Sequence, residues 1–69
     1  MNYNINLKKL NEELLNRGYS INKLAKLTGL SKSTVARVLK SNNVARVETI
    51  FKIANVLGLE AKELIVENK

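Results

Sequence analysis

The chain has 69 residues and a mass of 7.7 kDa, enough for one small domain with a single hydrophobic core. It contains neither cysteine nor histidine, which excludes disulfide frameworks, thiolate catalysis and the usual zinc sites. Its net charge of +6 and pI of about 9.9 favour a polyanionic partner. We expect no metal, no cofactor and no secretory signal, and the longest apolar run, three residues, is too short to span a membrane.

Apolar residues recur at three- and four-residue spacing along the chain, and this spacing predicts helices. Gly18, Gly29 and Gly58 each follow such a stretch, where a glycine suits the left-handed residue that ends a helix. The predicted helices cover, in chain order, residues 7–17, 21–28, 32–40, 46–57 and 60–66. No strand is expected, because no segment alternates apolar and polar residues for more than a few positions.

Short polar side chains stand where these helices are predicted to begin. Asn4 or Asn6 is expected to cap the first helix, Ser20 the second and Ser31 the third. Glu60 places a negative charge near the positive N-terminus of the last helix. Residues 41–43 are turn formers and separate the third helix from the fourth.

The predicted core combines one apolar face from each helix. In the first four helices the inward-facing residues are expected to be Leu7, Leu10, Leu14, Leu24, Ala25, Leu27, Val35, Val38, Leu39, Val47, Ile50, Phe51, Ala54 and Leu57. The predicted fold class is therefore all-α, with five short helices around one core over about residues 5–66. Residues 1–69 form a single domain in this interpretation.

The basic residues are concentrated in one part of the chain. No acidic residue occurs between Glu13 and Glu48, yet this stretch holds seven of the twelve basic residues. The rest of the chain has five basic and six acidic residues, a net charge of −1. A solvated basic surface is the alternative interpretation, since ten asparagines and nine lysines are typical of an AT-rich genome. The segregation of charge favours a surface for a polyanion.

Residues 21–40 have the pattern of a helix-turn-helix, in which two helices cross closely on either side of a short turn. The crossing requires a small residue, which Ala25 supplies, and Gly29 stands at the turn four residues later. Leu24, Leu30 and Val35 supply apolar side chains on both sides of the turn. An ordinary helical hairpin that uses Gly29 only to end a helix is the alternative.

The chain resembles the lambdoid phage repressor and Cro family, also called the XRE family, over about residues 10–66. The resemblance is carried by the runs YSINKLAKLTGLSKSTVARVLKSN and RVETIFKIANVLGLEAKEL. It implies a lambda-repressor-like fold and a transcription regulator of phage or mobile-element origin, acting in the cytoplasm of a bacterial or phage-infected cell. It also implies that residues 32–40 lie in the DNA major groove and that a homodimer binds a two-fold operator. Three features depart from the family pattern: Thr28 replaces an apolar residue, Ile21 replaces a glutamine, and residues 41–46 lack glycine and proline.

Side-chain directions on the predicted third helix agree with that resemblance. With Val35 and Val38 facing the core, a basic stripe is left on the opposite side of the helix. Arg37 can donate two hydrogen bonds to guanine O6 and N7, which is the commonest specific contact to DNA. Base contacts are predicted for Lys32, Ser33, Ala36 and Arg37.

Contacts to the DNA backbone require donors on both sides of the groove. They are predicted for Ile21, Asn22, Lys23, Ser31, Thr34, Lys40, Asn42, Asn43 and Arg46. The start of the second helix offers free N–H groups to a phosphate, whereas Asn42 and Asn43 also fit a simple turn.

Dimerisation is predicted because one reading helix makes few base contacts. The predicted interface consists of Val44, Ala61 and Ile65, with a purely structural place for Ile65 in the core as the alternative.

Two classes of function fit these features, and neither is enzymatic. The carboxylates lack a histidine, cysteine or activated hydroxyl beside them, so the parts of acid–base and nucleophilic catalysis are missing. The preferred hypothesis is a sequence-specific regulator whose partner is double-stranded operator DNA, with no small-molecule ligand and no membrane. The alternative is an antitoxin or another protein-interaction module on the same fold. The acid-free basic stretch favours the regulator.

Overall fold

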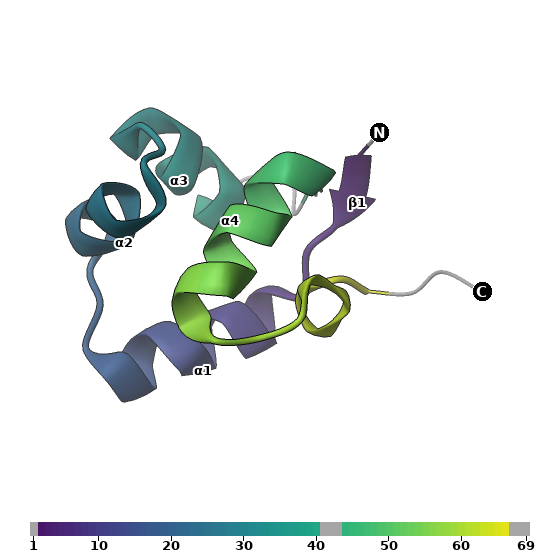
Figure 1. Ribbon diagram of the computed structural model, residues 1–69, viewed down its shortest axis with the longest axis horizontal. Helices are drawn as coiled ribbons and strands as arrows, with labels where there is room; N and C mark the ends of the chain where they lie inside the picture. Colours follow the sequence, from purple (N-terminus) through teal and green to yellow (C-terminus); the bar gives the residue numbers. More distant parts are fainter. Residues whose placement is uncertain (1, 41–43, 67–69) are drawn as a thin grey trace.

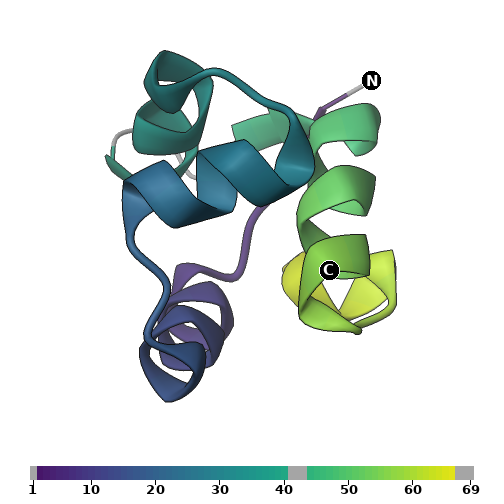
Figure 2. The same ribbon diagram turned by 60° about the vertical axis from the view of Figure 1, so that its left-hand side comes forward.

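The computed structural model describes residues 2–40 and 44–66. Its elements are, in chain order, β1 (Asn2–Asn4), α1 (Leu7–Arg17), α2 (Ile21–Thr28), α3 (Lys32–Lys40), β2 (Val44–Arg46), α4 (Val47–Leu57) and the 3-10 helix η1 (Ala61–Leu64) (Figure 1). The helix α1 lies at one end of the molecule and α3 at the opposite end, with α2 and α4 between them (Figure 1, Figure 2). The predicted site residues Asn42 and Asn43 lie outside the described residues.

The first three helices begin and end at the predicted residues. The Asn6 side chain, and not that of Asn4, caps α1 by accepting a hydrogen bond from the Lys9 N–H at 3.1 Å. The hydroxyl of Ser20 caps α2 in the same way, by accepting from the Lys23 N–H at 3.1 Å. All three glycines adopt the left-handed conformation directly after a helix, as predicted.

The expectation that the chain contains no strand is wrong. β1 pairs with β2 in an antiparallel register that sets Tyr3 opposite Ala45 and Asn4 opposite Val44. The same N-terminal segment also bonds to the residues that follow η1, where the Val66 N–H donates to the Asn4 carbonyl at 2.9 Å. These pairings bury Ile5, which is only 2% exposed. The N-terminal segment thus stabilises the fold by bridging β2 and the C-terminal segment.

Two helix predictions in the second half of the chain need correction. α4 begins at Val47, one residue later than expected, because Arg46 keeps an extended backbone as the N-cap and as the last residue of β2. The last helix is a 3-10 helix of four residues, Ala61–Leu64, in place of the predicted helix over residues 60–66. A capping box between Glu60 and Glu63 closes its start. The described residues therefore form four α-helices and one 3-10 helix, not five α-helices.

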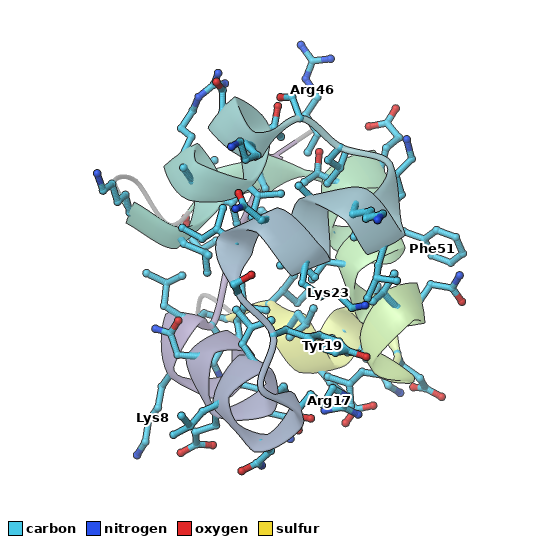
Figure 3. The ribbon with its side chains drawn as sticks, turned by 90° about the vertical axis from the view of Figure 1, so that its left-hand side faces the viewer. Lys8, Arg17, Tyr19, Lys23, Arg46 and Phe51 are labelled. Carbon is cyan, nitrogen blue, oxygen red and sulfur yellow. The ribbon has the colours of Figure 1, made fainter. Side chains whose placement is uncertain are left out.

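One hydrophobic core unites these elements. Its buried members are Ile5, Leu10, Leu14, Leu24, Ala25, Val35, Val38, Ala45, Ile50, Ile53, Ala54, Leu57 and Leu64. Three residues predicted to face inward are substantially exposed: Leu27 at 43%, Val47 at 45% and Phe51 at 62%. The face of α4 that is buried passes through Ile53, which was not among the predicted core residues. Figure 3 shows Phe51 projecting sideways from α4 into solvent.

Candidate nucleic-acid interface

α2 and α3 pack closely and are joined by Gly29, Leu30 and Ser31. Leu24 and Val35 are completely buried where the two helices meet, and Ala25 is 5% exposed. Gly29 has φ 78°, a left-handed conformation that a residue with a Cβ atom adopts only under strain, so the chain can reverse here in few residues. Residues 21–40 therefore form a helix-turn-helix, with the small residue and the turn glycine in the predicted places.

Hydroxyl groups hold the backbone on both sides of this turn. The Thr28 hydroxyl donates to the Leu24 carbonyl at 2.8 Å and accepts from the Leu30 N–H at 3.2 Å. The Ser31 hydroxyl caps α3 by accepting from the Thr34 N–H at 3.1 Å, and it lies 2.9 Å from the Thr34 hydroxyl. The predicted cap at Ser31 is confirmed, and the polar residue at position 28 has a structural role.

α3 presents different residues to its two sides. Val35 and Val38 are buried in the core, and Leu39 is half-buried against it. The opposite side carries the exposed residues Lys32, Ser33, Arg37 and Lys40. Ala36 and Thr34 are half-buried at its margins. Since the helix has no acidic residue and three basic ones, its exposed side can meet the phosphates and base edges of a nucleic acid.

A hollow of about 380 Å³ lies between α3 and the segment that runs from β2 into α4. It is lined by Leu30, Thr34, Arg37, Val38, Val44, Ala45, Arg46 and Thr49. Two arginines and two threonines from separate parts of the chain thus converge on one concave surface. Thr49 was not predicted as a site residue, and its position on the first turn of α4 gave no signal; only the folded arrangement of α3 and α4 places it beside this hollow.

A comparison with protein-family models matches the model described as Helix-turn-helix to residues 7–64. The chain belongs to the XRE/Cro-like helix-turn-helix family. Membership of this family implies DNA binding and a role in transcriptional regulation. Its domains are typically non-enzymatic. Searches among curated proteins and among solved structures find no match.

Several cations of this helix-turn-helix domain face solvent on α2, on α3 and at the start of α4. Arg46 extends away from the body of the molecule (Figure 3), and Lys23 lies on the first turn of α2 together with the exposed residues Ile21 and Asn22. Among residues 2–40 and 44–66 the ion pairs are Lys9–Glu13, Arg17–Glu13 and Lys62–Glu60. Lys23, Lys32, Lys40 and Arg46 take part in none of them, so these charges are available to an anionic partner.

Arg17 has a different place in the helix-turn-helix domain, although it belongs to the same acid-free stretch. It is the last residue of α1 and lies at the end of the molecule opposite to Arg46 (Figure 3). Its guanidinium donates to the Leu57 carbonyl at 2.6 Å and pairs with Glu13. A hydrogen bond from Arg17, and to a smaller extent one from Lys9, holds the pKa of Glu13 below its usual value near 4.5. Arg17 therefore ties α1 to the C-terminal end of α4.

Two of the three residues predicted for a dimer interface, Val44 and Ile65, lie beside the N-terminal segment. Val44 is 38% exposed and pairs with Asn4 in the sheet. Ile65 forms a β-bridge with Ile5, and both Ile65 and Ala61 are half-buried against the core. The fold thus brings the 44–46 and 64–66 segments next to the N-terminal segment.

The same described residues contain no group of three acidic side chains placed to hold a metal ion. None of the helices within residues 2–40 and 44–66 is long and apolar enough to cross a membrane.

Proposed function

We propose that the chain is a sequence-specific transcriptional regulator that binds double-stranded operator DNA as a homodimer. In this proposal α3 enters the major groove, and the protein acts in the cytoplasm of a bacterial or phage-infected cell. The observation that carries the proposal is the two-sided character of α3. Val35 and Val38 anchor the helix in the core, while Lys32, Ser33 and Arg37 stand on its exposed side. A helix held in this way can enter a groove about 12 Å wide without disturbing the fold.

The exposed side of α3 supplies residues suited to base edges. Ser33 and Arg37 are four residues apart, so their side chains lie one above the other and reach neighbouring base pairs. Arg37 donates two hydrogen bonds to guanine O6 and N7, and Lys32 reaches the same acceptors of a second guanine. Ala36 lies at the margin of the exposed side, where its methyl group contacts a thymine methyl.

Contacts to the sugar–phosphate backbone hold α3 in register. Lys23, Lys40 and Arg46 supply charge, and the first turn of α2 adds the N–H groups of Ile21 and Asn22. Ser31, Thr34 and Thr49 supply hydroxyl donors close to α3. The hollow between α3 and α4 extends this surface, since Arg46 and Thr49 line it together with Thr34.

The homodimer places two copies of α3 about 34 Å apart, one turn of the DNA duplex. The interface in this proposal is built from Val44 and Ile65, which lie beside the N-terminal segment, together with Ala61. Val66, which is 46% exposed and bonds to the same segment, enlarges this apolar surface. So small an interface gives weak association in solution, which strengthens when a two-half-site duplex brings two copies together.

The test of base reading begins with selection of bound duplexes from a random pool. On the selected duplex, Arg37→Ala should weaken binding by about 1–3 kcal/mol and relax the preference at one base pair of each half-site. Lys23→Ala is the matched control, because loss of a phosphate contact weakens selected and unrelated duplexes alike. If Arg37→Ala also weakens both duplexes equally, the assignment of Arg37 to a base edge is wrong.

Analytical ultracentrifugation tests the homodimer on a palindromic duplex with two half-sites. The expected complex contains two chains per duplex. A complex of one chain per duplex at saturating protein would refute the dimer without affecting the test of Arg37.

A further inference from the structure

The Thr28 hydroxyl links the end of α2 to the turn that leads into α3. It donates to the Leu24 carbonyl at 2.8 Å, with the Ala25 carbonyl at 3.2 Å, and it accepts from the Leu30 N–H at 3.2 Å. A hydroxyl group has one proton and two lone pairs, so it can make these bonds at the same time. The side chain thereby connects one residue on each side of Gly29.

Packing alone does not require this hydroxyl. A valine has nearly the same shape as threonine and is also branched at Cβ, so it would fill the half-buried position without supplying the hydroxyl. Within the described residues, the Leu30 N–H donates to the Thr28 hydroxyl and to no other acceptor. The neighbouring Gly29 N–H donates instead to the Ala25 carbonyl at 2.9 Å. The hydroxyl therefore serves the hydrogen bonding of the turn and not the packing of the side chain.

Leu30 connects this bond to the position of α3. Its side chain packs against the core and lines the hollow beside Thr34 and Arg37. It is followed directly by Ser31, which caps α3. A backbone that is held at Leu30 therefore holds the first turn of α3, where Lys32 and Ser33 stand.

We propose that Thr28 is a positioning residue for DNA recognition, which holds the turn so that α3 presents its exposed side to the bases at a defined angle. The inference rests on the proposed function of α3 as the reading helix. Contacts to base edges require accurate placement, to about half an ångström, whereas long lysine and arginine side chains follow a phosphate over a wider range. Loosening the turn should therefore lower affinity for the selected duplex more than affinity for unrelated DNA.

The experiment compares the wild type with Thr28→Val, which keeps the shape and removes the hydroxyl, and Thr28→Ser, which restores it. Hydrogen exchange by NMR should show faster exchange of the Leu30 amide in Thr28→Val, while the adjacent Gly29 amide serves as the internal control. The ratio of affinities for selected and unrelated duplexes should fall by about two- to tenfold, the range expected for one hydrogen bond. Thr28→Ser should keep the wild-type exchange rate of the Leu30 amide and the wild-type ratio of affinities.

Titrations are made at a temperature where circular dichroism shows each variant folded, with Thr28→Ala as a second hydroxyl-free variant if the valine lowers the folded fraction. An unchanged affinity ratio in the hydroxyl-free variants, or an equal loss on both duplexes, would overturn the positioning role and leave the proposed function intact. A wild-type protein that selects no duplex would refute the proposed function, and the positioning role with it.

Discussion

Arg17 offers a test of whether a basic residue of the acid-free stretch serves the fold or the DNA. Arg17→Ala removes the 2.6 Å bond to the Leu57 carbonyl and the ion pair with Glu13. The Leu57 carbonyl lies at the last residue of α4, where the negative end of the helix dipole favours a cation. The substitution should therefore destabilise the contact between α1 and α4.

The expected magnitude follows from the geometry. A hydrogen bond between a charged and a neutral group contributes about 1.5–3 kcal/mol, and an exposed ion pair usually less than about 1 kcal/mol. Because the Arg17 side chain is 33% exposed, we expect a total of about 1–2 kcal/mol. With an unfolding entropy of about 2.1 cal/mol/K for each of the 69 residues, this loss lowers Tm by about 7–14 °C.

Thermal unfolding followed by circular dichroism measures the change in Tm, and titration of DNA at a temperature where both proteins are folded measures affinity. Arg17→Ala should lower Tm and leave affinity for DNA near the wild-type value. Lys23→Ala is the matched control with the opposite result expected, because Lys23 is exposed and forms no ion pair within the described residues. A wild-type Tm combined with weaker DNA binding by Arg17→Ala would refute the assignment of Arg17 to the contact between helices.

Three further predictions concern pH, salt and the core. The hydrogen bonds from Arg17 and Lys9 lower the pKa of Glu13 in the folded protein, so the ionised Glu13 stabilises the fold. This stabilisation is complete above the unfolded pKa near 4.5 and is lost as pH falls through the lower folded pKa. Acidification should therefore lower Tm more in the wild type than in Glu13→Gln. If each subunit neutralises about three to four phosphates, the logarithm of the DNA association constant should fall with the logarithm of salt concentration with a slope of roughly −5 to −7, and an affinity independent of salt would exclude the basic surface. In chemical denaturation, Ile53→Ala should cost about 2–5 kcal/mol because this side chain is 0% exposed, whereas Phe51→Ala, 62% exposed, should cost less than about 1 kcal/mol; equal costs would contradict the assigned faces of α4.

The ends of α1, α2 and α3 could be predicted because each has a local signal. A short polar side chain bonds to the first turn, and a left-handed glycine follows the last turn of α1 and α2. The exposed side of α3 also follows from helix geometry, once Val35 and Val38 are assigned to the core. These features depend on residues within a few positions of one another, so the sequence alone carries them.

The buried face of α4 could not be chosen from spacing. The predicted set contains Val47 and Phe51, and the observed set replaces them with Ile53; both sets have three- and four-residue intervals. The strand pairing escaped prediction because three residues are too few to show alternation, and the partners lie about forty residues apart. The contribution of Thr49 to the hollow has the same origin, because it depends on how two separate elements are placed in the fold. Pairings between distant segments decide these features.

The bridge between Ile5 and Ile65 has a consequence for how the chain folds during synthesis. The segment around Ile5 is synthesised early, yet two of its backbone partners belong to Leu64 and Val66, which follow about sixty residues later. Until those residues emerge, Ile5 lacks the neighbours that cover it, and the nascent chain exposes apolar surface. Folding of this domain is thus completed only after translation has passed residue 66, and its rate then depends on closing a loop that encloses nearly every other residue.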